Sequence, residues 1–212
     1  MSTIEQVPAE QRFVLHGISW QTYLNLRESP ENEHVHMTYD QGELEMMSPS
    51  RTHEQYAGFI ARLIAIWTEE RNIDIASCRT MTFKRADLQH GLEPDNCYYV
   101  ANELLMRSKL EVDLMIDPPP DLAVEIDLYS GKFHKLALYA AFGVPEVWRF
   151  DGRNLTLYLL DAEGRYEPSS GSASFPGLPP AEIERVLGQM GTASETALVR
   201  SFRDWVRTGT TK

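Results

Sequence analysis

The sequence predicts an α/β domain in which a mixed β-sheet is flanked by helices, with a helical appendage at the C-terminal end. Three observations predict this class. Apolar residues recur at helical spacing after Thr52, the apolar stretch 121–126 has the character of a buried central strand, and a second helix at 132–142 leads into another strand. The chain of 212 residues, 42% hydrophobic and 24% charged, is long and apolar enough for one packed core.

The N-terminal quarter predicts one helix and one β-hairpin. Residues 1–12 are polar and are expected to fray, and an amphipathic helix is expected at 18–26. Strands follow at 34–39 and 43–47, and the glycine-containing turn between them is typical of a hairpin.

The strongest helix prediction covers residues 52–71. Thr52 and Gln55 fit a capping box, in which a threonine and a glutamine three residues later satisfy the first free backbone groups of the helix. The apolar residues that follow at helical spacing are Tyr56, Phe59, Ile60, Leu63, Ile64 and Trp67. One face of this helix is therefore expected to be buried.

The rest of the chain predicts more strands than helices. The predicted elements are strands at 77–83, 95–100, 121–126, 146–150 and 155–160 and helices at 132–142, 181–190 and 193–206. The composition changes after Tyr166, where a serine-rich loop begins. We therefore divide the chain into a core at 1–166 and a C-terminal loop with two helices at 167–212.

Charge and cysteine content limit the classes of protein that fit. A net charge of −11 and a pI of about 5.0 argue against a protein that coats nucleic acid through bulk electrostatics, but leave room for an enzyme with a local binding site. Cys78 and Cys97 are too few for a disulfide scaffold and form no Cys-x-x-Cys motif. Without a signal-peptide pattern or a membrane-spanning apolar run, we expect a cytoplasmic protein that does not enter a membrane.

An acidic pair is the strongest chemical signal in the residues themselves. The sequence has no Walker loop, no Gly-x-Gly-x-x-Gly, no Gly-x-Ser-x-Gly and no His-Glu-x-x-His, which disfavours nucleotide-dependent enzymes, hydrolases with a serine elbow and zincins. Asp95 follows Pro94 at the start of a predicted strand, and Glu125 lies near the end of the most apolar one. A carboxylate inside such a strand is costly unless it is paired or bound to metal.

Two readings of this pair stay open from the residues alone. On neighbouring strands, Asp95 and Glu125 would hold Mg²⁺ or Mn²⁺ through oxygen, and the ion would polarise a phosphodiester. Alternatively, the Pro-Asp step is an ordinary turn and Glu125 faces solvent at a sheet edge.

Several segments occur in order over residues 39–150 and together resemble a known family. They are Tyr39–Pro49, His53, Glu93–Asp95, Pro120–Ile126, Lys135–Tyr139 and Gly143–Trp148. As an ordered set they are similar to the Uma-type restriction endonucleases, a bacterial group, formerly a domain of unknown function, within the PD-(D/E)XK nuclease superfamily. The resemblance implies a restriction-endonuclease-like fold and a nuclease that uses a divalent metal.

The resemblance also implies roles for individual residues. Asp95 matches the PD aspartate and Glu125 the acidic residue of the (D/E)XK element, so both would ligate the metal. Asp127 stands where that element carries its lysine, and strand alternation places it on the face of Glu125, as a third ligand or as an exposed residue. Lys135 matches a lysine that family members carry on the next helix. It would orient the attacking water or stabilise the developing phosphorane charge, unless it lies on a solvated helix face.

His53 and Glu54 open the long helix and are auxiliary candidates. A histidine at this place recurs in the family near the presumed cleft, and a helix N-terminus suits contact with phosphate. The alternative is a capping or surface role.

The leading function is a Mg²⁺- or Mn²⁺-dependent endonuclease that hydrolyses DNA. A non-catalytic, nuclease-like binding or regulatory module is the first alternative, favoured by the net charge of −11 and by Asp127 in the usual place of lysine. A small-molecule or nucleotide hydrolase with the same metal site is the second.

We also expect a two-fold homodimer, because closed two-fold pairs are the commonest oligomers. An apolar stripe at Leu198, Phe202, Trp205 and Val206 either forms a partner surface or docks on the core of its own chain.

Overall fold

Eleven strands in two β-sheets and the helices around them make up the described part of the chain. The computed structural model describes residues 10–129 and 135–209. The strands are β1 (Gln11–His16), β2 (His36–Asp40), β3 (Glu43–Ser48), β4 (Ala76–Ser77), β5 (Phe83–Arg85), β6 (His90–Leu92), β7 (Asn96–Tyr99), β8 (Leu122–Ile126), β9 (Glu146–Phe150), β10 (Leu155–Leu160) and β11 (Tyr166–Ser169). The helices are α1 (Trp20–Arg27), the short 3-10 turn η1 (Pro30–Asn32), α2 (Arg51–Arg71), α3 (Glu103–Met106), α4 (Lys135–Phe142), α5 (Pro180–Leu187) and α6 (Glu195–Thr208).

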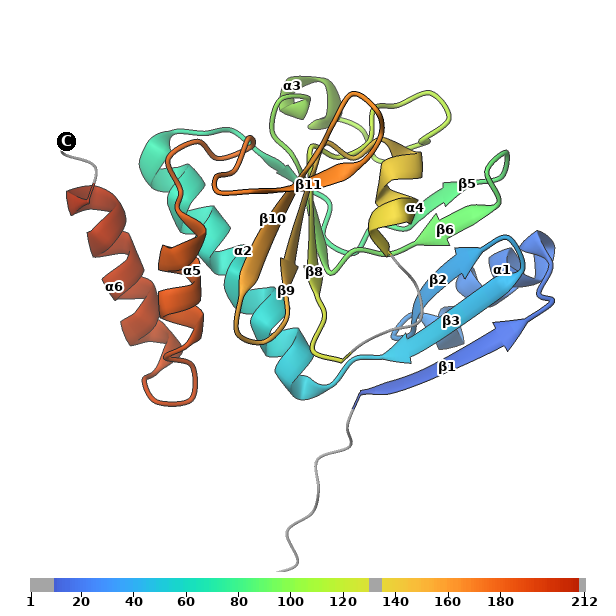
Figure 1. Ribbon diagram of the computed structural model, residues 1–212, viewed down its shortest axis with the longest axis horizontal. Coiled ribbons are helices and arrows are strands. Elements are labelled where there is room, and N and C mark those ends of the chain that lie inside the picture. The colour runs from blue at the N-terminus through green and yellow to red at the C-terminus, as the bar shows by residue number, and fades with distance from the viewer. Residues whose placement is uncertain (1–9, 130–134, 210–212) are drawn as a thin grey trace, which may run out of the picture.

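The predicted α/β class, with strands flanked by helices, is confirmed, but the strands form two sheets instead of one. The larger sheet has the order β11-β10-β9-β8-β7-β4, with β8 and β9 parallel and the other neighbours antiparallel. The smaller sheet, β1-β3-β2-β6-β5, is antiparallel throughout. The chain first forms β1, β2 and β3 of the smaller sheet and enters the larger sheet at β4. It then adds the β5–β6 hairpin to the smaller sheet beside β2 and returns to the larger sheet as β7 (Figure 1).

Helix α1 covers one face of the smaller sheet. Tyr23 of α1 is fully buried with Met37, Tyr39 and Leu44. A Cβ at Gly91 would lie 2.3 Å from the Tyr23 hydroxyl oxygen, so only glycine lets β6 approach this ring. The opposite face carries His36, Thr38 and Glu45 together with Met47, and His36 lies next to the candidate site described below.

Helix α2 begins slightly differently from the prediction. Ser50 is the N-cap, and its hydroxyl accepts a hydrogen bond from the His53 backbone N–H at 3.2 Å. The capping box at Thr52 is therefore wrong, because the serine two residues earlier takes the same role. The helix ends at Arg71 as predicted, and Asn72 closes it in the left-handed conformation with a φ of 49°.

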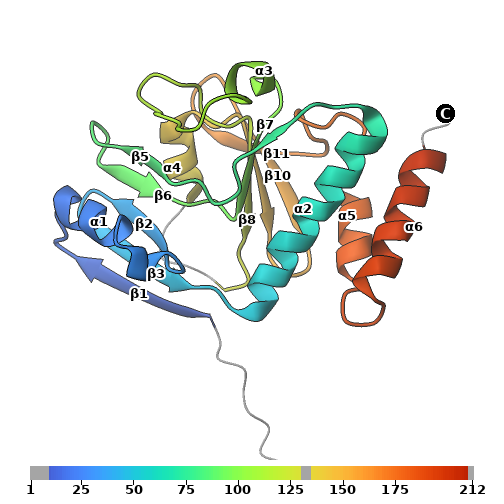
Figure 2. The same cartoon turned by 180° about the vertical axis from the view of Figure 1, so that it is seen from behind.

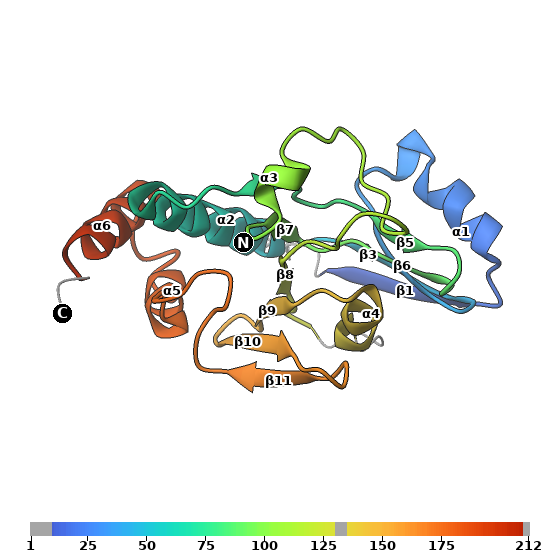
Figure 3. The ribbon, with the colours of Figure 1, turned by 90° about the horizontal axis from the view of Figure 1, so that it is seen from above.

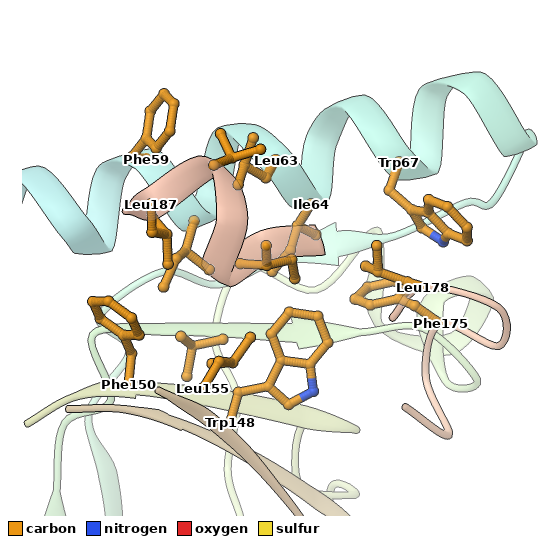
Figure 4. Packing of buried hydrophobic residues seen from close by; sticks show 14 of the residues in the cluster. Phe59, Leu63, Ile64, Trp67, Trp148, Phe150, Leu155, Phe175, Leu178 and Leu187 are labelled. Atoms are coloured by element: carbon orange, nitrogen blue, oxygen red, sulfur yellow. The ribbon is translucent and has the colours of Figure 1, made fainter. Parts of the chain in front are cut away.

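The main core lies between α2 and one face of the larger sheet. Figure 4 shows side chains of α2 meeting those of β9, β10 and the C-terminal segment. The labelled residues are Phe59, Leu63, Ile64, Trp67, Trp148, Phe150, Leu155, Phe175, Leu178 and Leu187. Residues 122, 124 and 126 of β8 point to this face, so residues 123 and 125 point to the other.

The C-terminal helices α5 and α6 pack on α2. Phe202 and Leu198 are buried in the core, and the Trp205 ring stacks on Trp67 at a centroid distance of 6.2 Å. Arg203 and Arg207 donate hydrogen bonds to Glu70 of α2. The apolar stripe therefore docks on the core of its own chain, and α6 offers no free apolar face to a partner.

The predicted boundary between residues 166 and 167 falls inside β11.

Helix α4 covers the other face of the larger sheet. Leu138, Tyr139 and Phe142 pack with Ala123 of β8 and Cys97 of β7. Figure 3 shows α2 and α4 on opposite sides of β8. The predicted start of this helix at 132 lies outside the described residues, and the helix described begins at Lys135.

Some short strands were not predicted. Strand β1 begins at Gln11, inside the segment expected to fray, and β6 and β11 have few apolar residues to mark them. The single strand predicted at 77–83 is instead the end of β4 and the start of β5, because the chain passes from one sheet to the other between them.

None of the helices in ranges 10–129 and 135–209 is long and apolar enough to cross a membrane.

Candidate active site

The two candidate carboxylates come together because β7 and β8 are antiparallel neighbours. Asn96 pairs with Val124 in this ladder, which places Asp95 opposite Glu125. The backbone N–H of Asp95 donates to the Val124 carbonyl at 3.1 Å, and the Asp95 Oδ2 accepts from the Ile126 N–H at 2.6 Å. Backbone groups of β8 thus hold the Asp95 carboxylate at the end of the strand that carries Glu125.

Helix α4 supplies two direct partners of Glu125. The Lys135 Nζ donates to Glu125 Oε2 at 2.6 Å, and the Tyr139 hydroxyl donates to Oε1. The two residues are four apart, so they lie on the same face of the helix. Tyr139 is fully buried and Glu125 is 4% exposed. The sequence motifs assign Tyr139 no role, although its four-residue spacing from Lys135 is a signal for it.

Two histidines flank Asp95 from different elements. His53, in the first turn of α2, places Nε2 3.4 Å from Asp95 Oδ2. His36, on β2 of the smaller sheet, places Nδ1 3.5 Å from Oδ1. The two rings meet edge to face at a centroid distance of 6.2 Å. No motif in the sequence marks His36, because only the packing of the two sheets brings it here.

The electrostatics of the cluster favour a charged Lys135 and an ionised Asp95. Burial would raise the pKa of Asp95, but His53, Lys135 and His36 together hold it below its usual value. Burial would lower the pKa of Lys135, but the carboxylates of Glu125 and Asp95 raise it. Burial raises the pKa of Glu125 and lowers that of His36 to about 4. The pKa of His53 is raised, because the Asp95 carboxylate outweighs its burial.

Asp127 has partners of its own at the end of β8. Its Oδ2 accepts hydrogen bonds from Arg149 Nε at 2.9 Å and Nη2 at 2.5 Å, and its Oδ1 lies 4.0 Å from Arg12 Nη2. Arg12 also donates to buried Glu45 at 3.1 Å. The structure therefore places Asp127 in an arginine pair beside the cluster and does not bring it to Asp95.

Glu54 points away from the cluster. It is exposed in the first turn of α2, whereas His53 beside it is 1% exposed and faces Asp95. Its carboxylate at the helix N-terminus suits the helix dipole and gives the residue a local role.

The donor set at Asp95 and Glu125 fits a hard divalent cation. Asp95 Oδ1 is buried without a hydrogen-bond partner among the described residues, as are both ring nitrogens of His53 and Nδ1 of His36. Such an orphaned carboxylate oxygen is costly unless a cation or water satisfies it. No group of three or more His, Cys, Asp and Glu side chains in the described ranges is arranged to hold a metal ion. Mg²⁺ needs only one or two carboxylates, because it keeps several of its waters.

Comparison with known proteins identifies the family and the fold of the chain. A family model described as "Putative restriction endonuclease" (Uma2) matches residues 20–190, a range that includes β2, α2, β7, β8 and α4. The chain belongs to the Uma2 family. Among solved structures it is similar to a protein from Anabaena variabilis described as a putative nuclease belonging to DUF820. The TM-score is 0.54 and the identity 16%, over 80% of this chain and 99% of that one. That likeness shows a shared fold. No curated protein matches the chain.

Proposed function

We propose that this Uma2 protein is a divalent-metal-dependent endonuclease that hydrolyses phosphodiester bonds in DNA. One observation carries the proposal. Asp95 and Glu125 converge from neighbouring strands, and Lys135 Nζ of α4 lies 2.6 Å from Glu125 Oε2. Two carboxylates and a lysine in this arrangement, in a chain of the restriction endonuclease family, are the parts that such hydrolysis needs.

Each residue of the cluster has a separate task in this proposal. Asp95 and Glu125 would hold Mg²⁺ or Mn²⁺, which when bound supplies Lewis-acid polarisation of the phosphodiester. Lys135 supplies a fixed positive charge next to both carboxylates and takes the place of the lysine that is absent at 127. It orients the attacking water and stabilises negative charge that develops on the phosphoryl oxygens. Tyr139 holds Glu125 in place.

The histidines act through Asp95. His53 and His36 lie on either side of its carboxylate and restrict its orientation from α2 and β2. Since neither residue hydrogen-bonds Lys135 or Glu125 among the described contacts, we treat both as positioning residues.

A plasmid-nicking assay tests the proposal. The protein is incubated with supercoiled and single-stranded DNA in Mg²⁺, Mn²⁺ or EDTA, and Asp95→Asn and Glu125→Gln are compared with the wild type. Asp87→Asn is the matched control, because Asp87 is an exposed carboxylate paired with Arg85 away from the site. We expect cleavage that needs the metal, is lost in both site variants and is kept in the control. Equal cleavage by Asp95→Asn would overturn the site.

The two alternatives give different results in the same samples. A non-catalytic module would bind Mn²⁺ or DNA in calorimetry without cleaving, and Asp127 in the usual place of lysine favours it. A small-molecule or nucleotide hydrolase would release phosphate or nitrophenol from soluble phosphodiesters and leave plasmid intact.

The proposal includes a two-fold homodimer on DNA. A single copy of a chain of this size contacts few phosphates, and the net charge of −11 opposes binding to DNA, so two copies on one duplex would help. Because the α6 stripe is buried, the partner surface must lie elsewhere. Large exposed apolar residues gather in and after α3: Leu104, Leu105, Leu110, Met115 and Ile116. Light scattering decides the matter, since a mass near 24 kDa, unchanged with Mg²⁺ and DNA, excludes the dimer.

A further inference from the structure

The two cysteines of the chain face each other across neighbouring strands. In the antiparallel ladder of β4 and β7, Ala76 pairs with Tyr99 and Ser77 with Tyr98, so the next position, Cys78, lies opposite Cys97. The backbone N–H of Cys78 donates to the Cys97 carbonyl at 2.9 Å, which fixes this register. Both residues are free thiols. The sequence alone did not indicate this, because the two residues are far apart in the chain and form no motif.

The backbone geometry suits a disulfide. Directly opposite residues in a hydrogen-bonded antiparallel pair have Cα atoms about 5.5 Å apart. Disulfides most often join Cα atoms about 5.5–6 Å apart. Because Cys78 and Cys97 lie opposite each other in the ladder, their side chains also share one face of the sheet. Cys78 and Cys97 can therefore be joined with little movement of the backbone.

The two thiols differ in access. Cys78 is half-buried, whereas Cys97 is fully buried and its thiol donates to the Arg79 carbonyl at 3.2 Å. An oxidant from solvent therefore meets Cys78 before it can reach Cys97.

We infer that Cys78 and Cys97 form a reversible dithiol–disulfide site whose oxidant is a peroxide. In the first step the Cys78 thiolate attacks one oxygen of hydrogen peroxide. An S–O bond forms, the O–O bond breaks, hydroxide leaves, and the sulfur becomes a sulfenic acid. In the second step the Cys97 sulfur attacks the Cys78 sulfur. The S–S bond forms, the S–O bond breaks, and the departing hydroxide leaves as water with the proton of the Cys97 thiol. Two electrons pass from the thiols to the peroxide.

The bond would close at the junction between the two sheets. The chain leaves the larger sheet at Cys78 and re-enters it at β7, and the segment between forms β5 and β6 beside β2 (Figure 2). Asp95 stands two residues before Cys97 on the returning strand, and Cys97 packs in the same cluster as Tyr139. A disulfide here ties together the two passages of chain that connect the candidate site to the smaller sheet.

Thiol counting and mass spectrometry on the full chain test the inference. The reduced protein is treated with excess hydrogen peroxide, excess peroxide is removed, and thiols are titrated in denaturant. Since the chain has two cysteines, we expect both thiols to disappear, the mass of the monomer to fall by two hydrogens, and dithiothreitol to restore both. A gain of oxygen atoms without loss of the second thiol, or a covalent dimer on a non-reducing gel, would overturn the inference.

Single variants provide the matched controls. In Cys97→Ser, Cys78 has no resolving thiol, so we expect a sulfenic acid that dimedone traps. In Cys78→Ser, the buried Cys97 should stay reduced under the same treatment. Oxidation of Cys97 in Cys78→Ser to the same extent as in the wild type would contradict the order of the two steps and so the inference. Thiol counts, mass and dimedone trapping need no nuclease activity, so this inference can fail or succeed independently of the plasmid assay.

Discussion

Lys135 Nζ lies 2.6 Å from Glu125 Oε2, so the ammonium group of a residue on α4 forms an ion pair with the carboxylate of the central strand β8. The pair is largely withdrawn from solvent, with side chains 19% and 6% exposed. In the PD-(D/E)XK pattern that the sequence resembles, the lysine follows the acidic residue on the same strand, where this chain has Asp127. In the proposed function, Lys135 on α4 takes the place of that lysine.

Lys135→Met should remove both the cation and its pairing. Because Glu125 would stay buried without its partner, we expect the free energy of unfolding to fall by about 3 kcal/mol. Metal-dependent DNA cleavage should be lost at temperatures where the variant is folded. Denaturant unfolding and plasmid nicking measure the two effects.

Lys84→Met is the control for Lys135→Met. Lys84 pairs with Glu28, and both side chains are about half exposed, at 49% and 62%. Its loss should change stability by less than about 1 kcal/mol and leave cleavage unchanged. A fully active Lys135→Met protein would remove this lysine from the mechanism.

Tyr139→Phe should affect cleavage more than folding. The substitution deletes the hydroxyl that donates to Glu125 Oε1 and keeps the buried ring. We expect a stability loss of about 1 kcal/mol, weaker Mn²⁺ binding and slower cleavage. Tyr166→Phe is the matched control, because the Tyr166 hydroxyl donates to the Val144 carbonyl at 2.5 Å, away from the carboxylates. Equal Mn²⁺ affinity in the two variants would show that Tyr139 does not orient Glu125.

Elements with strong periodicity could be predicted from the sequence. Helix α2, the β2–β3 hairpin and β8 carry continuous apolar patterns and lie close to their predicted bounds. Strand β1 has an alternating pattern too polar to stand out, and it becomes a strand only because β3 pairs with it. Local pattern thus marks the elements that bury most apolar surface, and pairing between distant segments decides the rest.

The residues of the candidate site likewise fall into two groups: those that the sequence predicts and those that only tertiary packing brings there. Asp95, Glu125 and Lys135 could be predicted, because the resemblance gave each a place in an ordered motif. His36 and the arginine pair of Asp127 could not, because β2 and β9 reach the site only through tertiary packing. The sequence suggested that Asp127 shared the face of Glu125, but it gave no sign that Arg149 would occupy its carboxylate.

Phe202→Ala tests how α6 is held. Phe202 is fully buried against the core of its own chain, so the truncation should cost about 3–5 kcal/mol of unfolding free energy. The loss should not depend on protein concentration, because the contact lies within one chain. Phe13→Ala is the control, since Phe13 is 63% exposed and lies outside the exposed group at α3, so its loss should cost less than about 0.5 kcal/mol. A Phe202→Ala defect that fades at high concentration would instead place this stripe in a dimer.

The pH dependence of stability should carry a contribution from His36. Burial lowers its pKa from 6.5 to about 4 in the folded protein. As the pH falls below 6.5, the unfolded chain therefore binds a proton that the folded chain does not. The stability present above pH 6.5 is lost between 6.5 and 4, and a shift of this size corresponds to about 3 kcal/mol. Wild-type stability should thus fall relative to His36→Gln over this range.

NMR titration of the His36 ring checks the cause directly. A midpoint near pH 4 is expected in the wild type. The Asp95 carboxylate, 3.5 Å from the ring, favours the protonated form and opposes the effect of burial. Asp95→Asn should therefore move the midpoint lower still, whereas Asp87→Asn should leave it in place. A titration midpoint near pH 6.5 in the wild type would mean that the His36 ring is exposed to solvent and that β2 does not pack against Asp95.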